Sequence, residues 1–205
     1  MVQLEMQQVT KRFGGHTVLK DLSLKSDAAV LGIAGSNGSG KSTLLRCLAG
    51  LIKAKGSIRW TIDGEVHKPD ELTGRIGYAA PYVELYEGLT VTENLSFIRS
   101  LHREALPFSE ADLSDLLERF QAAPLADKPY GDLSTGQRQR VKLAAACLWD
   151  PAILFLDEPG ANLDDAGRLL IRELVEEFGR RERMVILASN QQEELELATE
   201  IVRLA

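Results

Sequence analysis

The sequence predicts an α/β fold, with a mixed or parallel core sheet, an N-terminal antiparallel β-subdomain and a helical insertion subdomain. Three observations point to it. Residues 29–34, 153–156 and 184–188 are short, continuously apolar runs, the pattern of parallel strands covered on both faces. Strict alternation of apolar and polar residues occurs in the first sixty residues, and helix signals replace strand signals between residues 90 and 128.

The alternating segments predict half-buried antiparallel strands. Their apolar members, which would share one core, are Leu4, Met6, Leu22, Leu24, Ile58, Trp60 and Ile62, and an Asp-Gly turn signal follows the last of them. Helices are expected at residues 41–51 and 166–178. The second carries an apolar stripe predicted to lie in the core, formed by Leu169, Leu170, Leu174 and Phe178.

The insertion contains two helix starts of the capping-box type, at Thr90 and Ser109. We expect one domain over residues 1–205, with a helical subdomain at about 90–145. The charge of −6, from 24 Lys+Arg and 30 Asp+Glu, argues against a nucleic-acid partner. The composition, 44% hydrophobic and 26% charged, excludes disordered and disulfide-scaffold classes.

The two cysteines and three histidines predict no metal site and no disulfide. Cys47 and Cys147 lie far apart in apolar contexts, as buried reduced thiols of a cytoplasmic protein do, and His16, His67 and His102 are expected in solvent. No apolar run approaches the ~20 residues that span a bilayer, so a membrane role would come through a partner.

A phosphate-binding loop follows the first apolar run. The motif G-x-x-x-x-G-K-[ST] is matched by Gly35, Ser36, Asn37, Gly38, Ser39, Gly40, Lys41, Ser42 and Thr43. Its glycines let backbone N–H groups surround phosphate oxygens, and the following helix N-terminus attracts the anion. In this motif Lys41 reaches the β- and γ-phosphates and Ser42 binds Mg²⁺, so the sequence predicts a P-loop NTPase.

Two carboxylates end the second apolar run. Asp157 and Glu158 would lie at the carboxyl end of a buried strand, where an unpaired charge is costly unless a metal balances it. We expect Asp157 to hold Mg²⁺ through water and Glu158 to act on the attacking water as general base or orienting group.

A third motif indicates which kind of P-loop NTPase the sequence encodes. Ser134 and Gln137 form an S-x-x-Q capping box that opens a helix expected to run to Trp149. The segment, with the sequence Leu133, Ser134, Thr135, Gly136 and Gln137, resembles the LSGGQ signature of ATP-binding cassette (ABC) proteins. The resemblance covers essentially the whole chain.

The resemblance implies ATP sandwiched head-to-tail between two such chains, with the phosphate loop of one facing the signature of the other. It places Phe13 against adenine, although a strand-ending apolar residue is the alternative interpretation, and it makes Asp164 the acidic end of a D-loop that crosses the dimer interface. We interpret three basic residues as one face of the helix that follows the signature, which would also contact the phosphates of ATP bound to the other chain: Arg138, Arg140 and Lys142.

Two positions depart from the family pattern. Pro81 stands where a glutamine normally contacts Mg²⁺ and the attacking water, and proline offers neither a side-chain amide nor a backbone N–H. Asn190 takes the place of the switch histidine, and its amide still donates a hydrogen bond. Tyr82, Glu84 and Gln191 are candidate replacements. We therefore expect hydrolysis that is retained but slow.

The expected function is that of the ATP-hydrolysing subunit of a membrane transporter. Its partners would be a second copy of itself or a related cassette, and a separate transmembrane permease, which places it on the inner face of the cell membrane. The alternative is an ATP-gated dimerising module with little turnover. Chain length and the Gly-Ser-Asn-Gly opening of the loop also resemble export-type subunits such as the haem-exporter ATPase of cytochrome c maturation.

Overall fold

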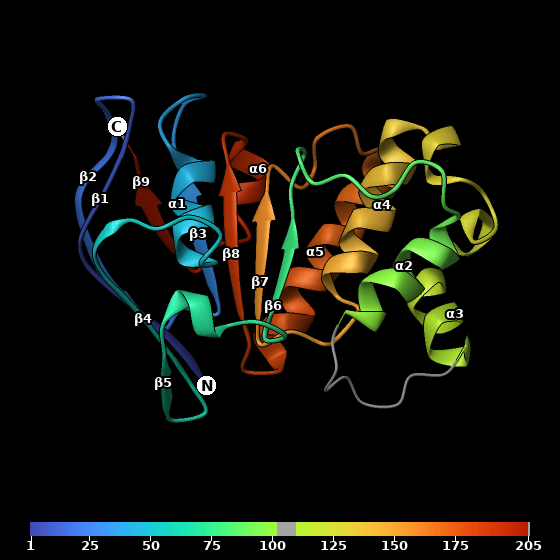
Figure 1. Ribbon diagram of the computed structural model, residues 1–205, viewed down its shortest axis with the longest axis horizontal. Coiled ribbons are helices and arrows are strands. Elements are labelled where there is room, and N and C mark those ends of the chain that lie inside the picture. Colours follow the sequence, from blue (N-terminus) through green and yellow to red (C-terminus); the bar gives the residue numbers. More distant parts are fainter. Residues whose placement is uncertain (102–109, 205) are drawn as a thin grey trace.

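The strands form two sheets, one parallel and one antiparallel (Figure 1). The structure is a computed structural model that describes residues 1–101 and 110–204. Five strands in the order β6-β7-β8-β3-β9 make the parallel sheet, and four in the order β2-β1-β4-β5 make the antiparallel one. The predicted fold class is confirmed, and the core sheet is parallel at every pairing.

The elements follow one another in the order that the sequence predicts. The strands are β1 (Val2–Phe13), β2 (His16–Ser26), β3 (Val30–Ala34), β4 (Lys55–Ile62), β5 (Glu65–His67), β6 (Ile76–Ala79), β7 (Ile153–Asp157), β8 (Met184–Ser189) and β9 (Glu200–Arg203). The α-helices are α1 (Lys41–Leu48), α2 (Val91–Ser100), α3 (Glu110–Arg119), α4 (Thr135–Ala146), α5 (Asp165–Arg180) and α6 (Gln192–Leu195). Short 3₁₀ turns are η1 (Pro69–Glu71), η2 (Ala123–Leu125) and η3 (Tyr130–Asp132).

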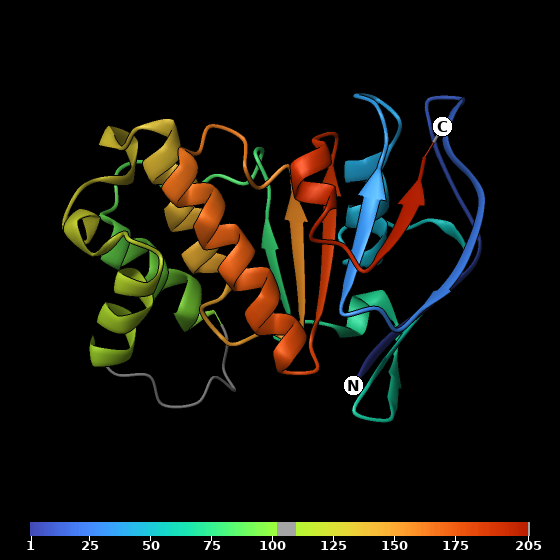
Figure 2. The same ribbon diagram turned by 180° about the vertical axis from the view of Figure 1, so that it is seen from behind.

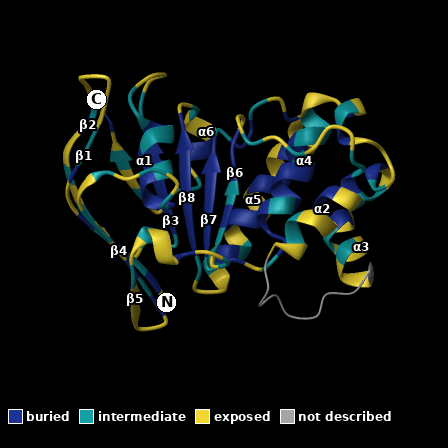
Figure 3. Ribbon diagram, in the orientation of Figure 1, coloured by how far each residue is buried: buried dark blue, intermediate teal, exposed yellow. Residues whose placement is uncertain are grey.

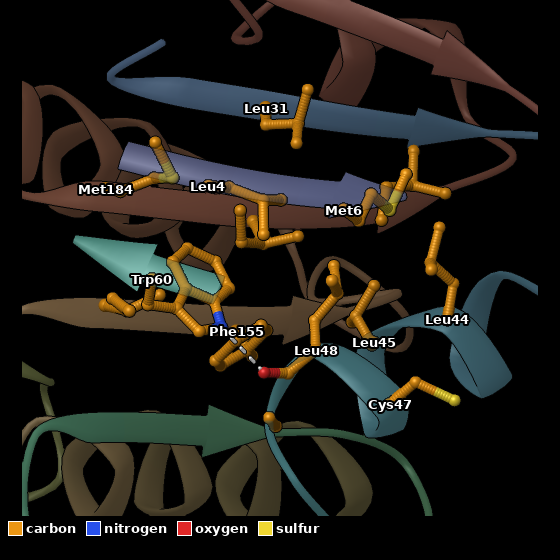
Figure 4. Close-up of a cluster of buried hydrophobic side chains, with 14 of the residues drawn as sticks. Leu4, Met6, Leu31, Leu44, Leu45, Cys47, Leu48, Trp60, Phe155 and Met184 are labelled. Carbon is orange, nitrogen blue, oxygen red and sulfur yellow. Dashed lines mark hydrogen bonds between the residues drawn. The ribbon is translucent and has the colours of Figure 1, made fainter. Parts of the chain in front are cut away.

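Helix α1 packs between the two sheets. Its apolar side meets the alternating residues of β1 and β4 on one side and β7 and β8 on the other (Figure 4). Trp60 is fully buried there, and its indole Nε1 donates to the Leu48 carbonyl over 3.0 Å. Its ring meets Phe155 edge to face at 6.0 Å between centroids. This core sets the position of α1 against the parallel sheet.

The other face of the parallel sheet is covered by α4 and α5 (Figure 2). Because helices cover both faces, β3, β7 and β8 are buried along their whole length (Figure 3). A third core lies inside the helical subdomain, where α2, α3 and α4 pack around Tyr130. The cores meet through α4, which contributes residues to the second and the third.

Glycine and turn geometry end two helices earlier than expected. Helix α1 ends at Leu48, not at residue 51, because Gly50 has φ +75°, and a Cβ there would lie 2.3 Å from the Pro69 carbonyl. Helix α4 ends at Ala146, short of Trp149, and Asp150 follows in the left-handed region at φ +53°.

The helix starts agree with their sequence signals. Both hydrogen bonds of the capping box are present at Thr90, which opens α2, and at Ser134, which opens α4. The box expected at Ser109 lies outside the described residues. Cys47 and Cys147 are buried free thiols, as predicted, and burial raises the pKa of the Cys147 thiol to about 12.

Two burial predictions are wrong. Leu169 is 54% exposed, because the buried stripe of α5 runs through Leu170, Ile171 and Leu174 and leaves Leu169 on its edge. His67 is partly buried, and its Nε2 has no hydrogen-bond partner, because β5 pairs it with the buried Trp60. His16 is exposed, and His102 is outside the described residues.

Among the described residues, no helix is long and apolar enough to cross a bilayer.

Asp150 joins the turn after α4 to the turn before β8. Both oxygens accept from Arg181, each over 2.8 Å, and Arg183 also donates to both. Burial alone would raise the pKa of Asp150, but these two guanidinium groups hold it below its ordinary value. The ionised carboxylate therefore stabilises the fold at neutral pH.

We expect Asp150→Asn to lower the free energy of unfolding by about 1 kcal/mol at pH 7, because the carboxylate is half exposed and partly screened. Asparagine also adopts positive φ, so the backbone is retained. Since the native pKa is depressed, the stability is present above about pH 4 and lost as pH falls through the lowered pKa. Urea unfolding from pH 7 to pH 2 should show a smaller acid loss in the variant; an unchanged pH profile would contradict the assignment.

Candidate functional site

The phosphate loop connects β3 to α1. Gly38 and Gly40 have φ of +85° and +98°, which glycine adopts readily and other residues rarely do. A Cβ on Gly40 would lie 3.0 Å from Leu19, so the loop also packs tightly on β2. Helix α1 starts without a side-chain cap and without an acid in its first turn. Its N–H groups are therefore free of intramolecular capping and suited to an anion.

Lys41 projects into this loop and is buried. Its Nζ donates to the carbonyls of Gly35 over 2.9 Å and Ser36 over 3.2 Å. The same nitrogen lies 3.3 Å from Glu158 Oε1. The ammonium is thus held between the loop and the end of β7, within reach of both.

Asp157 is 1% exposed, and neither carboxylate oxygen has a hydrogen-bond partner. Burial raises the pKa of this carboxyl, and Glu158 acts in the same direction, whereas Ser42 and Lys41 lower it. A buried orphan carboxylate next to a hydroxyl fits a hard cation such as Mg²⁺. No group of three or more His, Cys, Asp or Glu side chains within the described ranges could hold a metal ion.

Glu158 follows Asp157 with φ +48°, a conformation that turns it away from the strand direction. Its N–H donates to the Ala188 carbonyl over 2.8 Å, which ties it to β8. Its side chain lies between the Lys41 ammonium and the Ser189 hydroxyl, which is 3.5 Å from Oε2. The carboxylate therefore faces the loop.

Asn190 reaches the same loop from the end of β8. Its Nδ2 donates to Asn37 Oδ1 over 2.9 Å. The backbone N–H of Gln191 donates to Ser189 over 3.0 Å. The structure thus brings Lys41, Asp157, Glu158 and Asn190 to one edge of the parallel sheet.

Phe13 lies at the tip of the β1–β2 hairpin and is 47% exposed, with the Lys11 ammonium 4.8 Å from its ring centroid. Val18 and Leu19 of the same hairpin border Gly40 of the phosphate loop. Phe13 is also the last residue of β1, so the alternative interpretation, a strand-ending apolar residue, fits the structure as well. An exposed aromatic at the rim of the loop suits stacking on a planar base.

The signature lies apart from the phosphate loop of its own chain. Strands β8, β7 and β6 separate β3, which leads into the loop, from α4, which starts with the signature (Figure 1). Both nevertheless lie toward the carboxyl ends of the parallel strands (Figure 1). One chain therefore offers two half-sites that do not meet.

Residues 159–164, which include the expected D-loop at 161–164, are bonded to elements on both sides. Gln139 of α4 donates to the Pro159 carbonyl over 2.9 Å, and Arg140 contacts Asp164 over 2.9 Å. Glu194 of α6 accepts from the Gly160 N–H over 2.8 Å. Asp164 also caps α5 through the Gly167 N–H. Sequence reasoning missed Gln139 and Glu194; the second lies in a polar segment with acids at 193 and 196 as well, so no local pattern singled it out.

Two further expectations change. Lys142 does not form one face with Arg138 and Arg140, because it is buried and bonded to Glu84 over 2.8 Å, whereas the two arginines are partly exposed. Glu84 is thereby drawn toward α4 rather than toward the phosphate loop. The hydroxyl of Tyr82 is hydrogen-bonded to that of Tyr78, and its ring lies beside Arg46 of α1, so Tyr82 lies on the side of the phosphate-loop helix, whereas Glu84 lies on the side of α4.

A family model described as ABC transporter matches residues 19–161. The chain belongs to this family. Membership implies an ATP-binding protein of the ABC ATPase class, in agreement with the phosphate loop and the signature-like segment.

The chain is similar to named members of the family. It is 35% identical over 203 residues to a "Probable sulfate/thiosulfate import ATP-binding protein CysA" of Chlorella vulgaris, covering 97% of this chain and 86% of the relative. It is 34% identical to "Sulfate/thiosulfate import ATP-binding protein CysA" of Escherichia coli K12, with 98% and 57% covered. The "ABC transporter ATP-binding protein NatA" of Bacillus subtilis is 32% identical, with 87% and 74% covered.

This ABC chain thus spans little more than half the length of some CysA relatives. A solved structure described as "Structure of ATP binding subunit of ABC transporter" matches its fold with a TM-score of 0.84 at 24% identity, over 98% of this chain and 85% of the other. The names of these relatives give no support to the expected resemblance to haem exporters.

Asp157 provides a test of the site. Asp157→Asn removes a buried charge that lacks a partner, so we expect the protein to unfold at higher temperature without nucleotide, with a gain of about 1 kcal/mol. The additional thermal stabilisation by ATP with Mg²⁺ over ATP with EDTA should disappear. Differential scanning fluorimetry of parent and variant measures both; an Mg²⁺-dependent shift that persists in the variant would contradict the metal assignment.

Proposed function

We propose that the chain is the ATP-binding and hydrolysing subunit of an ABC membrane transporter and works as a head-to-tail dimer. The observation that carries the proposal is the separation of the phosphate loop from the signature across the parallel sheet. Two copies related by a two-fold axis would place each loop opposite the other's signature. ATP contacts made with both copies would then favour the closed dimer, because ADP lacks the γ-phosphate that bridges them.

In the proposed site, the helix N-terminus and Lys41 bind the phosphates, and Phe13 stacks on adenine. Ser42 and Asp157 would hold Mg²⁺, which supplies Lewis-acid stabilisation of phosphoryl charge. Glu158 accepts the proton of the attacking water or orients it, and its Oε1 lies 3.3 Å from the Lys41 ammonium that binds the phosphates. Asn190, held against the loop, donates a neutral hydrogen bond.

Reopening after hydrolysis would move a separate transmembrane permease, docked on the helical subdomain. The transported compound would be selected by that permease. The relatives named for sulfate and thiosulfate import favour an importer over the export-type alternative.

We also propose that turnover is slow. Pro81 removes an amide that would orient water and metal, and loss of one preorganised donor costs ~10²–10³ in rate. The second candidate function, an ATP-gated dimerising module with little turnover, has the same observation in its favour. The intact pair of Asp157 and Glu158 speaks against it.

Glu158→Gln separates the two functions. It keeps the shape of the side chain and removes its basicity, so we expect ATP turnover to fall at least ~10²-fold while an ATP-bound dimer accumulates. Phosphate release and light scattering after size exclusion measure the two effects. Glu196→Gln, on the exposed side of the turn after α6, is the matched control and should behave as the parent. A parent as inactive as the Glu158 variant would favour the gated module.

Pro81→Gln tests the cause of the slow turnover. Restoring the amide should raise the hydrolysis rate about tenfold or more, since part of the lost donor contribution returns. Pro81→Ala is the control, because it removes the ring without adding an amide, and should leave the rate near that of the parent. Equal rates for all three proteins would show that residue 81 does not limit turnover.

A further inference from the structure

The chain crosses from the core sheet to the helical subdomain through residues 80–89, which we call the crossing segment. It starts at the end of β6 and ends one residue before the cap of α2. Its far half is held by the fully buried Asn94 side chain, which bonds the backbone of Tyr86 and Leu89. Its near half is attached to two helices that carry opposite half-sites of the nucleotide.

The first attachment is to α1, the helix of the phosphate loop. Tyr82 hydrogen-bonds the Tyr78 hydroxyl, and the Arg46 guanidinium lies 3.9 Å from the centroid of the Tyr82 ring. Arg46 is one turn after Ser42 on α1, so both side chains project from the same face of the helix. A shift of α1 therefore acts directly on Tyr82.

The second attachment is to α4, the helix of the signature. Lys142 is 6% exposed, and its Nζ donates to the Pro81 carbonyl over 3.1 Å and to Glu84 Oε1 over 2.8 Å. The hydroxyl of the buried Tyr130 donates to the other Glu84 oxygen over 3.0 Å. Burial alone would raise the pKa of Glu84, but Lys142 and Tyr130 hold it below its ordinary value.

Helix α4 is packed against the sheet at its C-terminal end, so a displacement at Lys142 would act mainly on its other end. Its C-terminal end rests on β6, where a Cβ on Gly77 would lie 2.0 Å from the Ala146 carbonyl. Lys142 lies one turn before that contact, and the signature cap Ser134 lies about two turns further. Because α4 is seated at this end and held in its middle through Lys142, a displacement at Lys142 would tilt its N-terminal half, which carries the signature and is bonded to residues 159–164 through Gln139 and Arg140.

We propose that Lys142 is a positioning residue that couples occupancy of the phosphate loop to the orientation of the signature helix of the same chain. The inference rests on the proposed function, because both half-sites are nucleotide sites there. The path runs from α1 through Arg46 and Tyr82 to the crossing segment, and from Glu84 through Lys142 to α4. The bonds of the buried Lys142 suit this role because its ammonium is costly to leave without partners and each hydrogen bond holds only in one geometry, whereas an apolar contact tolerates sliding.

Lys142→Met tests the coupling, because it keeps the length and burial of the side chain and removes the charge and both hydrogen bonds. We expect the ATP-dependent dimer and the turnover rate to fall about tenfold, with the dissociation constant of a fluorescent ATP analogue for the monomer unchanged within about twofold. Glu84→Gln should act in the same direction, and the double variant should be no worse than Lys142→Met alone.

The matched control is Arg119→Met. It breaks the ion pair of 2.7 Å between Arg119 and Glu177, which joins α3 to α5 and does not involve the crossing segment. Both dimer formation and affinity should stay as in the parent. An equal loss in this control, or a parallel loss of monomer affinity in Lys142→Met, would overturn the proposal.

Hydrogen exchange separates this proposal from the proposed function. In the parent, ATP with Mg²⁺ should change amide exchange at the phosphate loop and at residues 134–137; in Lys142→Met only the first change should remain. The parent response is required even if the protein neither dimerises nor hydrolyses ATP. If Lys142→Met fails to fold, Glu84→Gln, whose side chain is half exposed, carries the same test. A retained response at residues 134–137 in the variant overturns the proposal.

Discussion

The structure depends on placing charges at the carboxyl edge of a sheet that is otherwise apolar. Strands β3, β7 and β8 are buried throughout, so the residues that follow them emerge in a poorly solvated place. Asp157 has no hydrogen-bond partner there, and Lys41 is satisfied by loop carbonyls. The same low solvation that makes these groups costly makes them strong ligands for a phosphate and its metal.

The helices beside the parallel sheet fix the position of the second half-site, the signature, relative to this edge. Helix α4 belongs to both the sheet-covering core and the subdomain core, so the signature at its start has a defined position relative to the sheet. Residues 159 and 160, which directly precede the expected D-loop, are bonded to α4 through Gln139 and to α6 through Glu194. Elements on either side of the edge are therefore linked by short, directional hydrogen bonds rather than by apolar contact alone.

The two departures from the family pattern have different structural consequences. Asn190 still reaches the phosphate loop, so its position keeps a polar contact. Pro81 offers only its carbonyl, which Lys142 of α4 occupies. Glu84 bonds the same lysine, while Tyr82 lies with Tyr78 and Arg46, near the helix that carries Ser42. The segment that has proline at position 81 is thus bonded to α4 through Lys142, by the Pro81 carbonyl and by Glu84.

The sequence by itself determined the fold class, the phosphate loop and the caps of α2 and α4, because these rest on local patterns: apolar runs, glycine spacing and side chains three residues apart. The end of α1 at Leu48, the end of α4 at Ala146 and the exposure of Leu169 depended on what packs beside them. Only the tertiary structure decided that the buried Lys142 bonds Glu84, 58 residues away in the chain, and that Glu194 accepts from the Gly160 N–H. Such partners leave no local pattern, since these contacts are defined by the folded neighbours that surround each side chain and not by the residues beside it in sequence.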